Sequence, residues 1–87
     1  MGGKLISDRA VCKLIAQAVP AHLGKTIAPE MKLRTHLGLD SIGLIGMVLT
    51  LEEGLGLDLF RVSDRVAQAV SVADVIAIVR TCAENQP

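Results

Sequence analysis

Apolar residues recur at intervals of three and four in three separate segments, and this helical repeat limits the possible folds more than any other feature of the chain. In the first segment the repeat is carried by Val11, Leu14, Ile15, Ala18 and Val19. Ser7 or Asp8 is predicted to cap this helix, because a short oxygen-bearing side chain accepts hydrogen bonds from the first backbone N–H groups. Pro20 is expected to end it, because proline lacks an N–H and clashes with the preceding turn.

A segment without any helical repeat follows over residues 20–40, and it contains two prolines and two glycines. We interpret it as a long loop that apolar side chains hold to the core. These side chains are Ile27, Met31, Leu33, Leu37 and Leu39. Loops of about twenty residues are unusual in a small domain and are often functional, and this one leads directly into the next helix.

The second helix is predicted over residues 41–55, and both of its faces are apolar. The stripe expected to face the core consists of Leu44, Met47, Val48, Leu51 and Leu55. The opposite side carries Ile42, Gly46, Leu49 and Glu53, which is an unusually apolar set for a helix face in contact with water. Gly54 and Gly56 are expected to end the helix by supplying a permissive backbone.

The last third of the chain predicts two more helices. A short one is expected over residues 62–69, where Arg61 and Arg65 share a face. Ser71 and Asp74 resemble a capping box before a final helix, with residues 83–87 fraying. The buried stripe of that helix consists of Val72, Val75, Ile76 and Val79. The chain is thus predicted to be all-α, a small four-helix bundle with a long first loop and a short third helix. It forms one domain over residues 1–87, with a core of about residues 7–82.

Composition and charge exclude several classes of function. Nine basic residues balance nine acidic ones, and one Phe is the sole aromatic residue, which argues against a nucleic-acid binder. No apolar run approaches the roughly 20 residues that a membrane span needs. Cys12 and Cys82 lie far apart in sequence and match neither a disulfide framework nor a metal pattern. We therefore expect a soluble, cytoplasmic monomer with reduced thiols and no metal site.

Catalytic constellations are not evident in the sequence. His22 and His36 lie in the loop without a nearby Cys or carboxylate at ligand spacing. Glu52 and Glu53 are adjacent, so their side chains diverge around the helix, and they are interpreted as a solvated helix end. No nucleophile elbow or phosphate-binding glycine loop is present.

Ser41 is the most distinctive polar residue, because it places a hydroxyl at a helix start directly after an exposed loop. The N-terminus of a helix has unpaired N–H groups and a partial positive charge, so it stabilises a phosphate ester. Asp40 can cap the helix and leave the Ser41 hydroxyl pointing outward. Alternatively, Asp40 and Ser41 are simply capping residues, which is the commonest role of such a pair.

Two motifs in register resemble those of acyl and peptidyl carrier proteins. Leu37-Gly38-Leu39-Asp40-Ser41-Ile42 is similar to their L-G-x-D-S-[LI] signature, and the stretch over residues 51–59 is similar to the segment that closes their second helix. The resemblance covers about residues 7–80. It implies that Ser41 receives a 4′-phosphopantetheine arm from a phosphopantetheinyl transferase that uses coenzyme A and magnesium, and that Asp40 helps to place the transferase's metal and substrate. The thiol of the arm would then carry an acyl, ketide or aminoacyl thioester. The cargo would be loaded by a ligase or synthase and passed to downstream pathway enzymes.

The chain departs from the family's usual acidic surface. Gly43 and Gly46 occupy outward positions of the second helix that carry carboxylates in typical members. We therefore hypothesise that partners dock by apolar contact on Ile42, Gly46, Leu49 and Glu53. The alternative is that the loop or the third helix covers Ile42 and Leu49. A neutral surface also favours a specialised acyl or aminoacyl pathway over primary fatty-acid synthesis.

Arg61 and Arg65 are predicted either to contact the arm's phosphate or an acidic partner, or to form a solvated face. The competing function is a helical protein–protein interaction module without a prosthetic group, and an enzyme is the least favoured class.

Overall fold

The computed structural model describes residues 6–19 and 27–84. Within these ranges the chain forms four α-helices and a 3-10 turn, and the predicted all-α fold is confirmed. The elements are α1 (Asp8–Ala18), α2 (Ser41–Leu55), η2 (Phe60–Val62), α3 (Ser63–Gln68) and α4 (Val72–Glu84). The third helix is one residue shorter at each end than the predicted span 62–69, because Val62 belongs to the 3-10 turn and Ala69 is extended.

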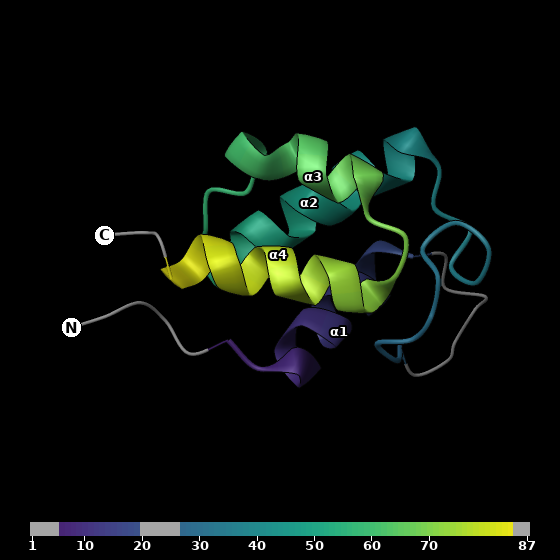
Figure 1. The fold of residues 1–87 in the computed structure, drawn as a ribbon, viewed down its shortest axis with the longest axis horizontal. Coiled ribbons are helices and arrows are strands. Elements are labelled where there is room, and N and C mark those ends of the chain that lie inside the picture. The colour runs from purple at the N-terminus through teal and green to yellow at the C-terminus, as the bar shows by residue number, and fades with distance from the viewer. Residues whose placement is uncertain (1–5, 20–26, 85–87) are drawn as a thin grey trace.

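The four helices enclose one core (Figure 1). Helix α4 lies between α1 and α3, with α2 behind it. Contacts join α1 to α2 and α4, and α3 to α2 and α4. An ion pair between Arg80 and Asp8 also links α4 to the start of α1.

Helix α1 follows its predicted pattern. The Ser7 hydroxyl is the N-cap and accepts a hydrogen bond from the Ala10 N–H at 3.1 Å. Val11 and Ile15 are fully buried, whereas the other three residues of the predicted stripe are half-buried. The helix ends at Ala18, and Val19 is extended, as expected before a proline. Pro20 itself lies outside the described residues.

Helix α2 buries four of its five predicted core residues, and the fifth, Leu55, is half-buried. Gly56 ends the helix in the left-handed conformation, with φ of 67°. The prediction that Gly54 helps to end the helix is wrong. A Cβ at Gly54 would lie 2.5 Å from Cδ2 of Leu14, so this glycine lets α1 pack closely on α2.

The predicted capping box at the start of α4 is confirmed. The Ser71 Oγ accepts a hydrogen bond from the Asp74 N–H at 3.3 Å. In return, Asp74 Oδ2 accepts from the Ser71 N–H at 3.1 Å and from the Val70 N–H at 3.0 Å. The predicted stripe of α4 is buried throughout. The helix continues to Glu84 and Ala83 is buried, so the fraying expected from residue 83 is wrong for residues 83 and 84.

The Asp74 cap gives the fold a predicted pH dependence. The N–H groups of Val70 and Ser71 donate to the carboxylate and hold the pKa of Asp74 below its ordinary value of 3.8. A depressed pKa adds stability above pH 3.8, and this contribution is lost as the pH falls through the folded-state value. Chemical denaturation between pH 6 and 2.5 should show this loss in the wild type. In Asp74→Asn the loss should be smaller, and equal losses in the two proteins would contradict the prediction.

The described part of the long loop, residues 27–39, is joined to the connection between α3 and α4 (Figure 1). The Leu33 N–H donates to Val70 O at 2.9 Å, and the Val72 N–H donates to Met31 O at 2.9 Å. Lys32 and Ser71 thereby form an isolated antiparallel bridge. The predicted anchors of the loop are buried except Met31, which is half-buried. The loop therefore presents its end to α2 from a fixed position.

Candidate functional site

A tight turn over residues 32–39 leads into the start of α2. The Gly38 N–H donates to Arg34 O at 3.2 Å, and the Leu39 N–H donates to Leu33 O at 3.0 Å. Gly38 has φ of 67°, a left-handed conformation that glycine adopts at little cost. His36, which is exposed, accepts the Lys32 N–H at Nδ1 at 2.8 Å and so closes the turn. His22 lies outside the described residues.

Asp40 is the N-cap of α2. Its Oδ1 accepts a hydrogen bond from the Gly43 N–H at 2.7 Å, and its carbonyl accepts from the Leu44 N–H at 2.8 Å. A Cβ at Gly43 would lie 3.1 Å from Cδ2 of Leu39 and 3.3 Å from Asp40 Oδ1. A side chain at Gly43 would thus crowd both Leu39 and the carboxylate that caps α2. Gly43 is half-buried, and the close contacts at its Cα come from its own chain.

Ser41 is the first residue of α2, and its side chain is exposed. Its hydroxyl makes no hydrogen bond to any described residue, because the capping role belongs to Asp40. The N–H groups of Ser41 and Ile42 also have no partner within the described ranges. The site therefore combines an accessible hydroxyl with two backbone donors and the positive end of a helix dipole.

A groove of about 300 Å³ runs from Ser41 between α2 and α3. Its lining is Arg34, Ser41, Leu44, Ile45, Val48, Leu49, Phe60, Ser63, Val66 and Ala67. On α2 it extends over the nine residues from Ser41 to Leu49, which span about 12 Å at a rise of 1.5 Å per residue. Most of these side chains are apolar, so the groove suits an apolar occupant.

The predicted partner surface is exposed, as are two further apolar residues beside it. Ile42 is 79% exposed and Leu49 is 48% exposed, so the alternative that the described loop or the third helix covers them is wrong. Gly46 and Glu53 are exposed as well. The sequence reasoning missed Ile45, which is 58% exposed, and Phe60, which is 66% exposed. The position of Ile45 one turn after Ile42 was the available signal, and no local signal identified Phe60.

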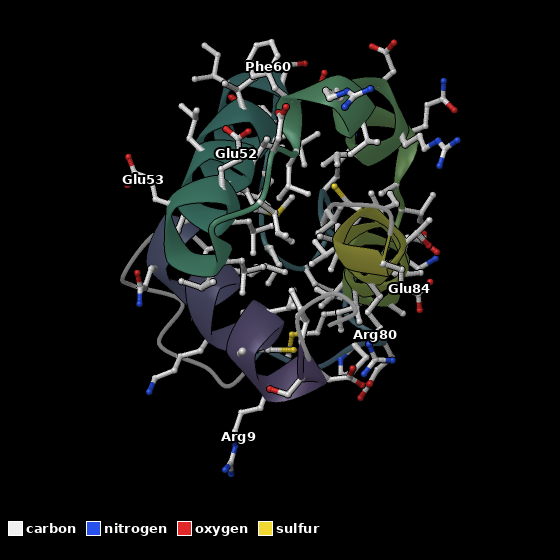
Figure 2. All side chains as sticks on the ribbon, turned by 90° about the vertical axis from the view of Figure 1, so that its left-hand side faces the viewer. Arg9, Glu52, Glu53, Phe60, Arg80 and Glu84 are labelled. Atoms are coloured by element: carbon white, nitrogen blue, oxygen red, sulfur yellow. The ribbon has the colours of Figure 1, made fainter. Side chains whose placement is uncertain are left out.

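Glu52 has a structural role that the sequence did not indicate. Its Oε2 accepts hydrogen bonds from the Leu59 N–H at 2.9 Å and the Phe60 N–H at 3.1 Å. Figure 2 shows Glu52 on the side of the Phe60 segment, whereas Glu53 points away from the molecule. The interpretation of both carboxylates as a solvated helix end is therefore wrong for Glu52. This residue holds η2 in place, and with it the distal end of the groove.

Arg61 and Arg65 do not line the groove. Both are exposed and line a separate depression that also contains Asp58 and Asp64. The cation that does line the groove with Ser41 is Arg34, which the sequence reasoning did not consider.

The two cysteines, Cys12 in α1 and Cys82 in α4, are half-buried thiols. Burial, with the nearby carboxylates of Asp8 and Glu30, raises the pKa of Cys12. The Cys82 Sγ donates to Asp58 O at 3.4 Å.

In the described part of the chain, no three His, Cys, Asp or Glu side chains lie close enough together to bind a metal ion. None of the helices there has the length and apolarity to cross a bilayer.

The comparisons with known proteins define the class. A family model described as a phosphopantetheine attachment site matches residues 9–79, so the chain belongs to the phosphopantetheine-bearing carrier proteins. The resemblance to acyl and peptidyl carrier proteins is thereby confirmed, and domains of this class are generally non-catalytic. Searches of curated proteins and of solved structures give no match.

The prosthetic group of the family is 4′-phosphopantetheine, which is attached covalently. The described residues fit such a group. An exposed hydroxyl stands at the positive end of α2, two backbone N–H groups are available for phosphate oxygens, and an apolar groove begins at the same residue.

Proposed function

We propose that the chain is a non-catalytic carrier, with a single domain over residues 1–87 and a core of about residues 7–82. The 4′-phosphopantetheine arm is attached to Ser41 and carries pathway intermediates as thioesters. The observation that carries this proposal is the exposed Ser41 hydroxyl at the start of α2. This hydroxyl does not cap the helix, because the Asp40 side chain does. A hydroxyl engaged in capping would have to break its own hydrogen bond before it could react.

Attachment is a phosphoryl-group transfer. Ser41 Oγ attacks the phosphorus of coenzyme A that bears the pantetheine, and a P–O bond forms as the bond to the departing 3′,5′-ADP breaks. The hydroxyl proton passes to a base of the phosphopantetheinyl transferase. Asp40 Oδ1 is held by the Gly43 N–H, whereas Oδ2 makes no hydrogen bond to the described residues. That oxygen is therefore available to the transferase's magnesium ion.

The cargo is an acyl, ketide or aminoacyl group, loaded by a ligase or synthase and passed to downstream enzymes. The arm raises the effective concentration of the cargo at each partner's active site without requiring a catalytic residue of the carrier. The apolar lining of the groove favours apolar acyl or ketide cargo. The zero net charge supports a specialised pathway, in which the carrier acts as a cytoplasmic monomer.

Partners dock on an apolar face next to Ser41. This docking face consists of the predicted residues Ile42, Gly46, Leu49 and Glu53, together with Ile45 and Phe60. Four of the six residues have large apolar side chains, and each of these four is at least 48% exposed. Helix α2 has no charged residue before Glu52, so electrostatic steering from it is weak.

Salt dependence tests the docking face. The affinity of the carrier for a phosphopantetheinyl transferase, measured by titration calorimetry, should change less than about threefold between low and moderate salt, because apolar contacts are not screened. Ile42→Ser should weaken binding by about fivefold or more, as expected for a central apolar contact. A tenfold or greater loss of wild-type affinity over the same salt range would contradict apolar docking.

Mass spectrometry separates a carrier from an interaction module that lacks a prosthetic group. Incubation with coenzyme A, magnesium and a broad-specificity transferase should add one phosphopantetheine group to the peptide that contains Ser41. A folded protein, judged by circular dichroism, that gains no mass would favour the interaction module instead.

A further inference from the structure

Arg34 has an unusual position in the described structure, because it lines the groove together with Ser41. It is the only Lys or Arg among the residues that line this groove. Its backbone carbonyl accepts the Gly38 N–H, so the turn that delivers Ser41 also fixes the main chain of Arg34. Its side chain is exposed and makes no ion pair or hydrogen bond to any described residue.

The contacts of the neighbouring residues place Arg34 at the Ser41 end of the groove. Glu52, late in α2, binds the backbone at Phe60, so the start of η2 lies beside the later part of α2. Helix α3 then returns toward the start of α2, and Val70 binds the Leu33 N–H, next to Arg34. Ser41 and Arg34 thus share one end of the groove, and Phe60 lies at the other.

We propose that Arg34 binds the phosphodiester that joins the arm to Ser41, and that this contact directs the arm along the groove toward Phe60. The inference rests on the attachment of the arm to Ser41 proposed above. It assigns a positioning role to a residue outside both sequence motifs.

The charges around Ser41 favour this contact. A phosphodiester on Ser41 carries one negative charge, and a guanidinium can donate two parallel hydrogen bonds to its oxygens. The free N–H groups of Ser41 and Ile42 offer donors at the helix end. Helix α2 contains no Lys or Arg, so it gives the phosphate no competing cation on the side of Ile42.

The alternative role of Arg34 is a contact with acidic groups of a docked enzyme. The two roles differ in what the isolated holo protein does. A phosphate contact orders the arm with no partner present, whereas a partner contact leaves the arm free until an enzyme binds. The experiment therefore uses the isolated holo carrier.

The test compares Arg34→Gln with Arg65→Gln, which removes an exposed arginine that does not line the groove. Each protein is loaded with coenzyme A and a broad-specificity transferase, and intact mass confirms loading. Amide NMR spectra of the apo and holo forms are then compared. In wild type and Arg65→Gln, loading should shift signals along the groove as far as Phe60. In Arg34→Gln the shifts should be confined to residues next to Ser41.

A second readout is the reactivity of the arm's thiol. A docked arm is less accessible, so Arg34→Gln should raise the rate of alkylation by a bulky maleimide about two- to fivefold, the range expected for an exposed ion pair. Moderate salt should raise the wild-type rate toward that of the variant. The alkylation rate of Arg34→Lys should lie between those of wild type and Arg34→Gln. Lysine keeps the positive charge but lacks the planar guanidinium that donates two parallel hydrogen bonds. Groove shifts and alkylation rates in Arg34→Gln equal to those of wild type would overturn the proposal.

The wild-type protein supplies a measurement that needs no variant. The side-chain Nε–H signal of Arg34 should shift on loading and return when a phosphodiesterase removes the arm. An unchanged signal in fully loaded protein would overturn the role of Arg34, even if Arg34→Gln could not be loaded. Failure to load wild type on Ser41 would instead contradict the proposed function, so the two failures are distinguishable.

Discussion

Replacement of Ser41 by alanine should abolish attachment of the arm and leave the fold unchanged. The Oγ atom forms the ester, and no other residue of the motif can replace it. The cap of α2 is the Asp40 side chain, which the substitution does not touch. Intact mass after incubation with coenzyme A and transferase should therefore show no gain, while the melting temperature stays within about 2 °C of wild type, as for a surface substitution.

The matched control is Ser63→Ala, which removes the other serine hydroxyl that lines the groove. This variant should gain one phosphopantetheine group at the wild-type rate. A mass gain in Ser41→Ala, or an unimpaired pathway in cells that carry it, would show that the tether is elsewhere. A large drop in melting temperature would instead assign Ser41 a structural role.

Leu51→Ala should have the largest effect on stability among the substitutions considered. Leu51 is fully buried in the second half of α2, and truncation of a buried leucine costs about 2–5 kcal/mol, including the cavity that it leaves. A chain of this length has a free energy of unfolding of about 4–13 kcal/mol, at 0.05–0.15 kcal/mol per residue. Urea denaturation should therefore show loss of a large fraction of the stability.

Leu49→Ala is the control, because it makes the same chemical change two residues away on the exposed side of α2. Leu49 is 48% exposed, so its truncation should cost less than about 1 kcal/mol of stability. It should instead weaken binding of the transferase, since Leu49 belongs to the docking face. Equal destabilisation by the two variants would contradict the separation of a core face from a docking face on this helix.

The parts of the fold that depend on residues close together in sequence could be predicted from the sequence. The helical repeat located α1, α2 and α4, since a buried stripe follows from the period of the helix alone. The cap of α4 at Ser71 and Asp74 was also local, because its hydrogen bonds span three or four residues. The position of Ser41 at the start of α2 was also predicted from local sequence, in a motif of six consecutive residues.

The features that were missed depend on elements far apart in sequence. The role of Gly54 appears only when α1 places Leu14 against it, and Glu52 finds its backbone donors seven and eight residues later. Arg34 reaches the groove because the loop pairs with the connection before α4. Periodicity and short motifs contain no information on contacts between residues far apart in sequence. These residues could therefore be identified only from the three-dimensional structure.

The pairing of residues 29–33 with residues 70–73 has a consequence for local opening of the carrier. Three backbone hydrogen bonds cross between these stretches, and two of them are donated by the first two residues of α4. The turn before Ser41 therefore cannot detach without also exposing amides at the beginning of that helix. The tethering end of the molecule and its C-terminal helix should exchange their protected amide hydrogens as one cooperative unit.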